Sequence, residues 1–169
     1  LFTSASIGWV IDKESFFNSS VIDNLKLRAS YGDLGSYASG LYDWQSTYST
    51  RLYSFNNVQA SGLAVGRYSN NALQWESTNV KNIGIDASFF GRKLNVELDV
   101  FRRNTAGILS TISIPITAGI ASAPTVNLAG VQNQGLELSL GTSGNIGKVG
   151  YSISGNFAIT ENVVTKYRG

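Results

Sequence analysis

The sequence predicts an all-β chain, arranged as an antiparallel up-and-down sheet that crosses a membrane as part of a β-barrel. Three observations predict this fold class. Apolar and polar residues alternate with a period of two in at least six segments. The connections between these segments are alternately short and long, and the apolar stretches end in polar residues at a similar distance from the short connections. Charged residues make up only 14% of the 169 residues, against about 25% in ordinary soluble domains.

The six alternating segments follow one another along the chain. In each of them one parity is apolar and the other is polar, as in strands that have one face in an apolar environment. They cover residues 4–11, 25–32, 82–89, 94–101, 135–141 and 149–159. No segment of comparable length has the i, i+3, i+4 spacing of an amphipathic helix, so we predict about six strands and no long helix.

The connections alternate in length. Residues 12–24, 90–93 and 142–148 form the shorter ones, whereas the long ones run over about 33–79 and about 104–134. Antiparallel strands produce this alternation when one end of the sheet carries turns and the other carries elaborated loops. Outer-membrane barrels are built in this way, with short periplasmic turns and long outer loops.

The apolar parity of each strand ends in a polar residue near the long-loop end. The residues that mark this limit in five strands are Asp33, Lys81, Arg102, Gln134 and Glu161. A bilayer requires apolar bands that end at a common height, and a barrel strand crosses it in about 9–11 residues. Trp9 and Tyr31 lie near opposite ends of the band, as the aromatic girdles of a membrane barrel would.

The composition excludes several kinds of catalytic site. The chain has no His and no Cys, which excludes triads with a His base, Cys nucleophiles and the usual zinc sites. Glu97 and Asp99 lie two residues apart on one strand face, which is common on a polar wall and does not by itself make an acid–base pair. We therefore expect no enzyme, no cofactor and no metal. The net charge of +2 gives no indication of nucleic-acid binding.

Four motifs, in order along the chain, resemble the SusC/RagA-like TonB-dependent transporters of Bacteroidota. They are Asn24–Gly32 (NLKLRASYG), Leu73–Thr78 (LQWEST) followed by NIGID at 82–86, Phe101–Thr105 (FRRNT), and Asn133–Leu138 (NQGLEL). Phe101 stands where the family's strand end has Tyr. The order and spacing hold from about Leu1 to about Val163, which is nearly the whole chain.

The resemblance implies a part of a much larger protein. Such transporters close a barrel of about 22 strands around a plug domain. Residues 1–169 would then be a slice of one TonB-dependent receptor β-barrel domain, with outer loops at about 33–79 and 104–134. No segment resembles the plug or the N-terminal segment that engages TonB, so we expect both to lie outside this chain.

The resemblance also implies a function and partners. The family imports glycans or peptides across the outer membrane of Gram-negative bacteria, beneath a SusD-like surface lipoprotein and with energy delivered through TonB. The expected neighbours of this chain are therefore the lipid bilayer, the rest of the barrel, the plug and the SusD-like lipoprotein. The sequence does not distinguish glycan from peptide as the substrate.

Two groups of residues are candidates for contacts. The first long loop is rich in aromatic side chains that could contact substrate or the lipoprotein lid, or could pack the loop against itself: Tyr37, Tyr42, Trp44, Tyr48, Tyr53 and Phe55. The polar parity carries charged side chains that we predict to face the lumen: Lys26, Arg28, Asp86, Glu97, Asp99, Arg103 and Glu137. Pairing across neighbouring strands is the favoured role of these charges, and contact with the plug or guidance of substrate is the second.

Two other interpretations remain open at the level of sequence. A soluble carbohydrate-binding β-sandwich would also alternate, with the charged parity as its solvated face. A non-transporting outer-membrane barrel, such as an adhesin, would share the strand pattern but not the transport function.

Overall fold

The computed structural model describes residues 1–37, 40–119 and 121–167 as strands, turns and two short 3₁₀ helices. The strands are β1 (Ser4–Val10), β2 (Ile22–Ser36), β3 (Thr47–Phe55), β4 (Val58–Arg67), β5 (Glu76–Phe89), β6 (Leu94–Thr111), β7 (Thr125–Ile146) and β8 (Val149–Tyr167). The 3₁₀ helices are η1 (Ile11–Lys13) and η2 (Ile116–Ala118). In the described part of the chain, no helix has both the length and the apolar character needed to cross a bilayer.

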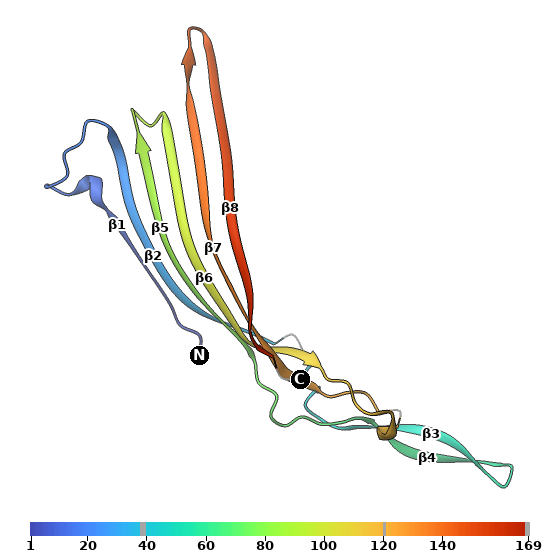
Figure 1. The fold of residues 1–169 in the computed structure, drawn as a ribbon. Coiled ribbons are helices and arrows are strands. Elements are labelled where there is room, and N and C mark those ends of the chain that lie inside the picture. The colour runs from blue at the N-terminus through green and yellow to red at the C-terminus, as the bar shows by residue number, and fades with distance from the viewer. Residues whose placement is uncertain (38–39, 120, 168–169) are drawn as a thin grey trace. The chain divides into compact units, whose positions relative to one another are not determined.

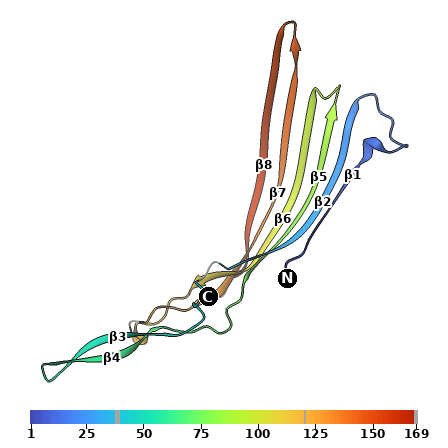
Figure 2. The ribbon, with the colours of Figure 1, turned by 180° about the vertical axis from the view of Figure 1, so that it is seen from behind.

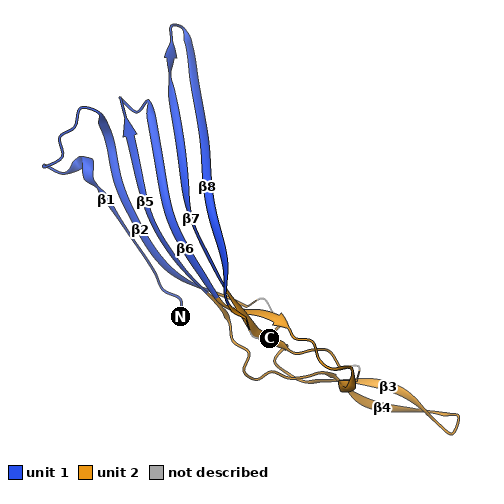
Figure 3. Ribbon diagram, in the orientation of Figure 1, with its two compact units in different colours: residues 1–34, 78–105, 131–165 blue, residues 35–77, 106–130, 166–169 orange. Residues whose placement is uncertain are grey.

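The chain divides into two compact units, shown in different colours in Figure 3. Unit 1 comprises residues 1–34, 78–105 and 131–165. Unit 2 comprises residues 35–77, 106–130 and 166–169. Each unit therefore gathers segments that are far apart in the sequence.

Unit 1 is built around a sheet of six strands in the order β1-β2-β5-β6-β7-β8. Figures 1 and 2 show these strands side by side in this order. β1 and β2 are antiparallel, with Trp9 opposite Leu27 and Gly8 opposite Arg28. Directly opposed residues share a face, so Trp9 and Leu27 lie on one face and Arg28 on the other. The predicted all-β antiparallel fold with about six strands in one sheet is confirmed.

The sheet has an apolar face that nothing in the described part of the chain covers. Among the described residues, Ala87 is the one buried hydrophobic residue, with 8% of its surface exposed. Ile7 is 72% and Ile83 is 65% exposed. A β-sandwich of this size would bury such side chains between two sheets about 10 Å apart. Among the described residues the six-stranded sheet forms a single layer (Figure 1), so the soluble sandwich does not fit.

Several strands are longer than the sequence pattern predicts. β2 continues to Ser36, β6 continues to Thr111 and β7 begins at Thr125, in segments that the pattern assigns to loops. The alternation fades in these segments because apolar residues fall on both parities, as Ile108 and Leu109 do on β6, but such strands still pair. Thr78 and Thr105, for example, join β5 to β6 through a hydrogen bond of 3.0 Å between their hydroxyl oxygens.

Unit 2 contains the hairpin β3–β4, which pairs from Phe55 opposite Val58 to Thr47 opposite Arg67. The turn consists of Asn56 and Asn57, with φ of 49° and 62°. Two consecutive residues with positive φ are the signature of a type I′ turn, and Asn accepts this conformation more readily than most residues.

The short connection between β1 and β2 is held by a side chain of η1. The backbone N–H of Leu25 donates to Oδ1 of Asp12 over 3.0 Å. This hydrogen bond stabilises the carboxylate and, together with Lys13, lowers the pKa of Asp12 below its ordinary value.

Candidate functional site

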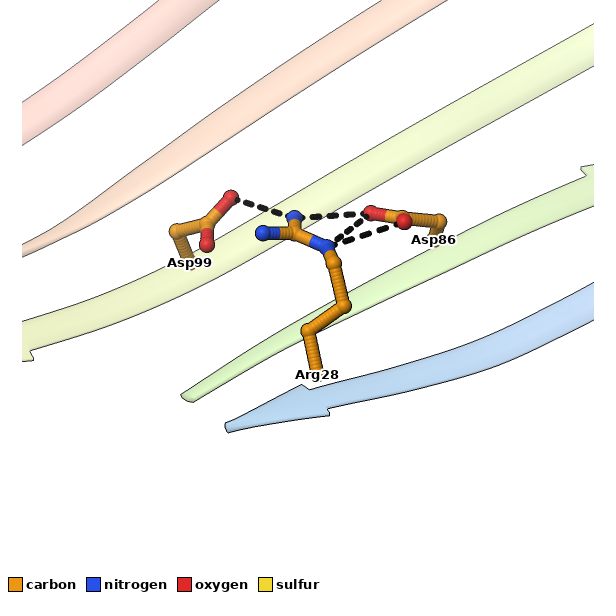
Figure 4. A network of polar contacts seen from close by, with 3 residues as sticks. All are labelled: Arg28, Asp86 and Asp99. Atoms are coloured by element: carbon orange, nitrogen blue, oxygen red, sulfur yellow. Dashed lines mark hydrogen bonds and ion pairs between the residues drawn. The ribbon is translucent and has the colours of Figure 1, made fainter. Parts of the chain in front are cut away.

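Three charged side chains from three neighbouring strands meet on the face opposite the apolar one (Figure 4). Nε of Arg28 on β2 donates to both carboxylate oxygens of Asp86 on β5, each over 2.9 Å. Nη2 of Arg28 donates to Asp86 Oδ1 over 2.7 Å and to Asp99 Oδ2 on β6 over 3.0 Å. We call these three residues the ion triad. It links three strands through charge-assisted hydrogen bonds, which are stronger than neutral ones.

Gly84 on β5 provides the space that the ion triad occupies. A Cβ at this position would lie 2.5 Å from Asp99 Oδ1 and 2.8 Å from Arg28 Nη2. The Arg28 side chain can therefore cross β5 toward Asp99 only because residue 84 has no side chain. Asp99 Oδ1 is buried and has no hydrogen-bond partner among the described residues, so the triad retains one free acceptor.

The other predicted lumen charges do not join the ion triad. In the part of the chain that the structure describes, no side-chain hydrogen bond or ion pair is made by Lys26, Glu97, Arg103 or Glu137. The sequence placed all seven charges on one parity, and the structure brings three of them together. Nor do the described residues contain any cluster of three acidic, His or Cys side chains suited to a metal ion.

Some of the predicted loop aromatics pack against neighbours within unit 2. The Tyr37 ring lies 5.4 Å from the Trp75 ring, and the Tyr37 hydroxyl donates to the backbone oxygen of Gly40. The Tyr53 and Phe55 rings on β3 are 4.9 Å apart. Trp75 lies just before β5, at the end of the first predicted long loop. It was not among the aromatic residues of that loop that were predicted to make contacts.

Other rings of this segment are exposed. Tyr42 is 66%, Tyr48 is 70% and Tyr53 is 66% exposed, and Trp44 is exposed as well. Tyr48 opposes Val65 and Tyr53 opposes Ala60, so these two tyrosines lie on opposite faces of the hairpin. Packing within the segment therefore leaves aromatic surface on both faces of β3–β4.

An ion pair in unit 2 fixes the backbone that carries Tyr42 and Trp44. Nη1 of Arg67 on β4 lies 2.6 Å from Asp43 Oδ1, and Nη2 donates to the backbone oxygen of Tyr42 over 2.8 Å. The sequence pattern does not predict this pair. Asp43 and Arg67 are 24 residues apart, and no short-range pattern connects them.

A chain of hydrogen bonds crosses three strands at the polar end of the apolar face. Arg102 on β6 donates to the side-chain oxygen of Gln132 on β7. Gln132 donates to Gln134 Oε1 over 3.0 Å, and Gln134 donates to Glu161 Oε2 on β8 over 2.7 Å. The sequence identified Arg102, Gln134 and Glu161 as the ends of apolar bands but did not identify Gln132. Its position two residues before Gln134, on the same face, is the signal that could have revealed it.

The chain matches one known protein family over nearly its whole length. Residues 2–168 match the family described as "TonB dependent receptor-like, beta-barrel". The chain belongs to this family. TonB-dependent receptors reside in the outer membrane of Gram-negative bacteria, and they are transporters rather than enzymes.

Individual TonB-dependent receptors resemble the chain along most of its length. TonB-dependent receptor P26 of Formosa agariphila is 34% identical over 143 residues, which are 84% of this chain and 14% of the relative. TonB-dependent receptor SusC of Bacteroides thetaiotaomicron is 28% identical, over 99% of this chain and 17% of the relative. The chain therefore spans less than a fifth of these relatives.

The fold of the chain also matches solved structures of related transporters. The RagAB peptide importer in its "closed-closed" state superposes with a TM-score of 0.85 at 27% identity. The match covers 98% of this chain and 18% of the RagAB chain. The six-stranded sheet is thus a segment of a TonB-dependent receptor barrel, and the predicted resemblance to SusC and RagA is confirmed.

Proposed function

We propose that this chain forms part of the wall of an outer-membrane importer that takes up glycans or peptides. One observation carries the proposal: a single-layered sheet has an exposed apolar face and, opposite it, a face that bears the ion triad. A bilayer on one side and a wet lumen on the other explain both faces. In this orientation Lys26, Glu97, Arg103 and Glu137 also line the lumen.

The charge of the ion triad supports a contact with the plug. The triad carries two carboxylates for one guanidinium, which leaves it a net negative charge. A cationic side chain from a domain inside the barrel would balance this charge. The plug, and the segment through which TonB delivers energy, would be supplied by the rest of the protein.

A SusD-like surface lipoprotein is the proposed partner of the aromatic segment. Tyr42, Tyr48 and Tyr53 are exposed on a unit that consists largely of the long connections, which are extracellular in outer-membrane barrels. Tyrosine offers large, rigid contact area at low entropic cost and is enriched in protein interfaces. The likeness to RagAB and SusC supports the same partner.

The experiment uses the full-length protein co-expressed with its SusD-like lipoprotein. The variant Tyr42→Ala/Tyr48→Ala/Tyr53→Ala is expected to lose co-purification of the lipoprotein and uptake, while the heat-modifiable barrel band in detergent is retained. The matched control replaces the same three tyrosines with Phe, which keeps the rings and should keep both activities. Unchanged co-purification in the Ala variant would mean that these rings serve only the loop itself.

Transport is tested separately with a strain that lacks the gene. Complementation with the full-length protein should restore uptake of one class of labelled nutrient, either glycans or peptides. If uptake of neither class depends on the gene, the proposal of a glycan or peptide importer fails.

A further inference from the structure

The apolar face of unit 1 carries a groove of about 570 Å³. Its floor is formed by one apolar residue from each of four neighbouring strands: Ile83, Val100, Leu136 and Ile159. It is lined mainly by apolar surface, and its exposed isoleucines have no cover among the described residues. The groove is separate from the ion triad, which lies on the other face of the sheet.

Polar residues close the groove at one end. Lys81, Arg102, Gln134 and Glu161 line it, and each lies two residues from one of the apolar residues on the same strand. Side chains two residues apart in a strand share a face. The sequence had identified these four residues as the limits of separate apolar bands, and the structure brings them to one end of one groove.

The two cations at this end are available to a ligand. Lys81 Nζ lies 6.0 Å from the centroid of the Tyr31 ring and has no carboxylate partner among the described residues. Arg102 donates only to the neutral amide of Gln132. The one carboxylate in the lining, Glu161, accepts a hydrogen bond from Gln134. Two cations and one carboxylate leave the polar end with a net charge of +1.

The polar end lies toward the long connections. Lys81 follows the connection that precedes β5, and Arg102 precedes the connection that follows β6. Long loops of outer-membrane barrels are extracellular, so this end faces the outer leaflet. That leaflet consists of phosphorylated glycolipids with several acyl chains. Anionic lipid headgroups attract Lys and Arg, and an apolar groove accommodates acyl chains.

We propose that this groove binds a phosphorylated, multiply acylated glycolipid of the outer leaflet. The acyl chains lie against Ile83, Val100, Leu136 and Ile159, and a phosphate group lies between Lys81 and Arg102. This proposal depends on the proposed function in one respect, the orientation of the barrel with its long connections outside the cell.

The test measures binding of purified lipid A to the full-length protein in detergent, by native mass spectrometry with titration. Each cation near an anionic lipid headgroup contributes about 1 kcal/mol, so Lys81→Gln/Arg102→Gln should weaken binding roughly 25-fold, at about 1.4 kcal/mol per tenfold change. The matched control Arg92→Gln/Lys148→Gln removes the same charge from the short connections and should bind as the wild type does. Equal affinity in both variants would overturn the proposal.

Two further arms separate the lipid from its phosphate. Dephosphorylated lipid A should bind the wild type weakly. Its affinity should be no higher than the affinity of intact lipid A for the Lys81→Gln/Arg102→Gln variant. Inorganic phosphate at millimolar concentration should not compete; competition would indicate a free-anion site and contradict the acyl groove. Val100→Trp, which fills the groove and keeps both cations, should also reduce binding.

Uptake distinguishes the two proposals. Lipid binding that is lost in the Lys81→Gln/Arg102→Gln variant, with uptake intact, supports the lipid site independently of transport. If the full-length wild type binds lipid A but transports nothing, the proposed function fails and the lipid site stands.

Discussion

At the scale of single residues, one glycine determines whether three strands are joined by charge. Arg28 reaches Asp99 across β5, and the path of its guanidinium passes over Gly84. The exposures of the three side chains, 34% for Arg28, 29% for Asp86 and 20% for Asp99, show that the ion triad is only partly solvated. Hydrogen bonds to partly buried charges contribute more than exposed surface pairs do.

Gly84→Ala should therefore destabilise the full-length barrel. The added Cβ would lie 2.5 Å from Asp99 Oδ1, so Arg28 must retreat and lose at least one carboxylate. We expect a loss of about 1–2 kcal/mol, measured as a lower urea midpoint for loss of the heat-modifiable band in detergent.

Gly141→Ala is the matched control for this substitution. Gly141 lies on β7, on the same face as Glu137, and an added Cβ there meets nothing within 4 Å. Its urea midpoint should stay within the error of the wild type. Equal stability of the two variants would show that the ion triad does not join the strands in the intact protein.

At the scale of elements, the hairpin β3–β4 depends on its turn. A two-stranded hairpin is only marginally stable by itself, so the conformation of Asn56 and Asn57 matters more here than in the large sheet. A β-branched residue in the left-handed region costs roughly 1–2 kcal/mol.

Asn57→Val should consequently loosen the hairpin, because Asn57 has a φ of 62°. Hydrogen–deuterium exchange on the full-length protein should show protection of the β3 and β4 amides reduced by roughly 5- to 30-fold. Asn57→Gly creates the Asn-Gly turn that type I′ geometry favours, and protection should be kept or increased. Reduced protection in the Gly variant would contradict this account of the turn.

The hairpin also shows why part of the fold could not be predicted from the sequence. β5 and β6 were predicted over 82–89 and 94–101, because apolar and polar residues alternate there between a lipid face and a polar face. β3 carries Tyr48 and Leu52 on one face and Tyr53 and Phe55 on the other, so it has no contrast of period two. A strand with two similar faces cannot be distinguished from an aromatic loop.

The same limit applies to the candidate site. Parity placed Arg28, Asp86 and Asp99 on one face together with Glu97 and Arg103, and it could not tell which charges would meet. That choice depends on the register between β2, β5 and β6 and on the open space at Gly84. Register follows from many backbone pairings together, and no single motif encodes it.

At the scale of the whole molecule, the six-stranded sheet has two open edges, as a segment cut from the wall of a barrel would have. β1 and β8 are the ends of the strand order, and all 19 residues of β8 are exposed. Unpaired backbone groups at a strand edge are tolerated in water only with protection, and they are not tolerated in lipid. In a closed barrel the outer edges of β1 and β8 would pair with neighbouring strands, which resolves both problems.

Residues 1–169 expressed alone should therefore fail to fold as a soluble monomer, whereas the full-length protein should give a heat-modifiable barrel in detergent. The sharper measurement is hydrogen–deuterium exchange of β8. Its amides should be protected in the full-length barrel, where both edges are paired. In the isolated chain refolded into the same detergent, β8 should exchange much faster than β5 and β6, which have neighbours on both sides within the sheet. A cooperatively folded, detergent-independent monomer with a protected β8 would contradict the assignment of this sheet to a barrel wall.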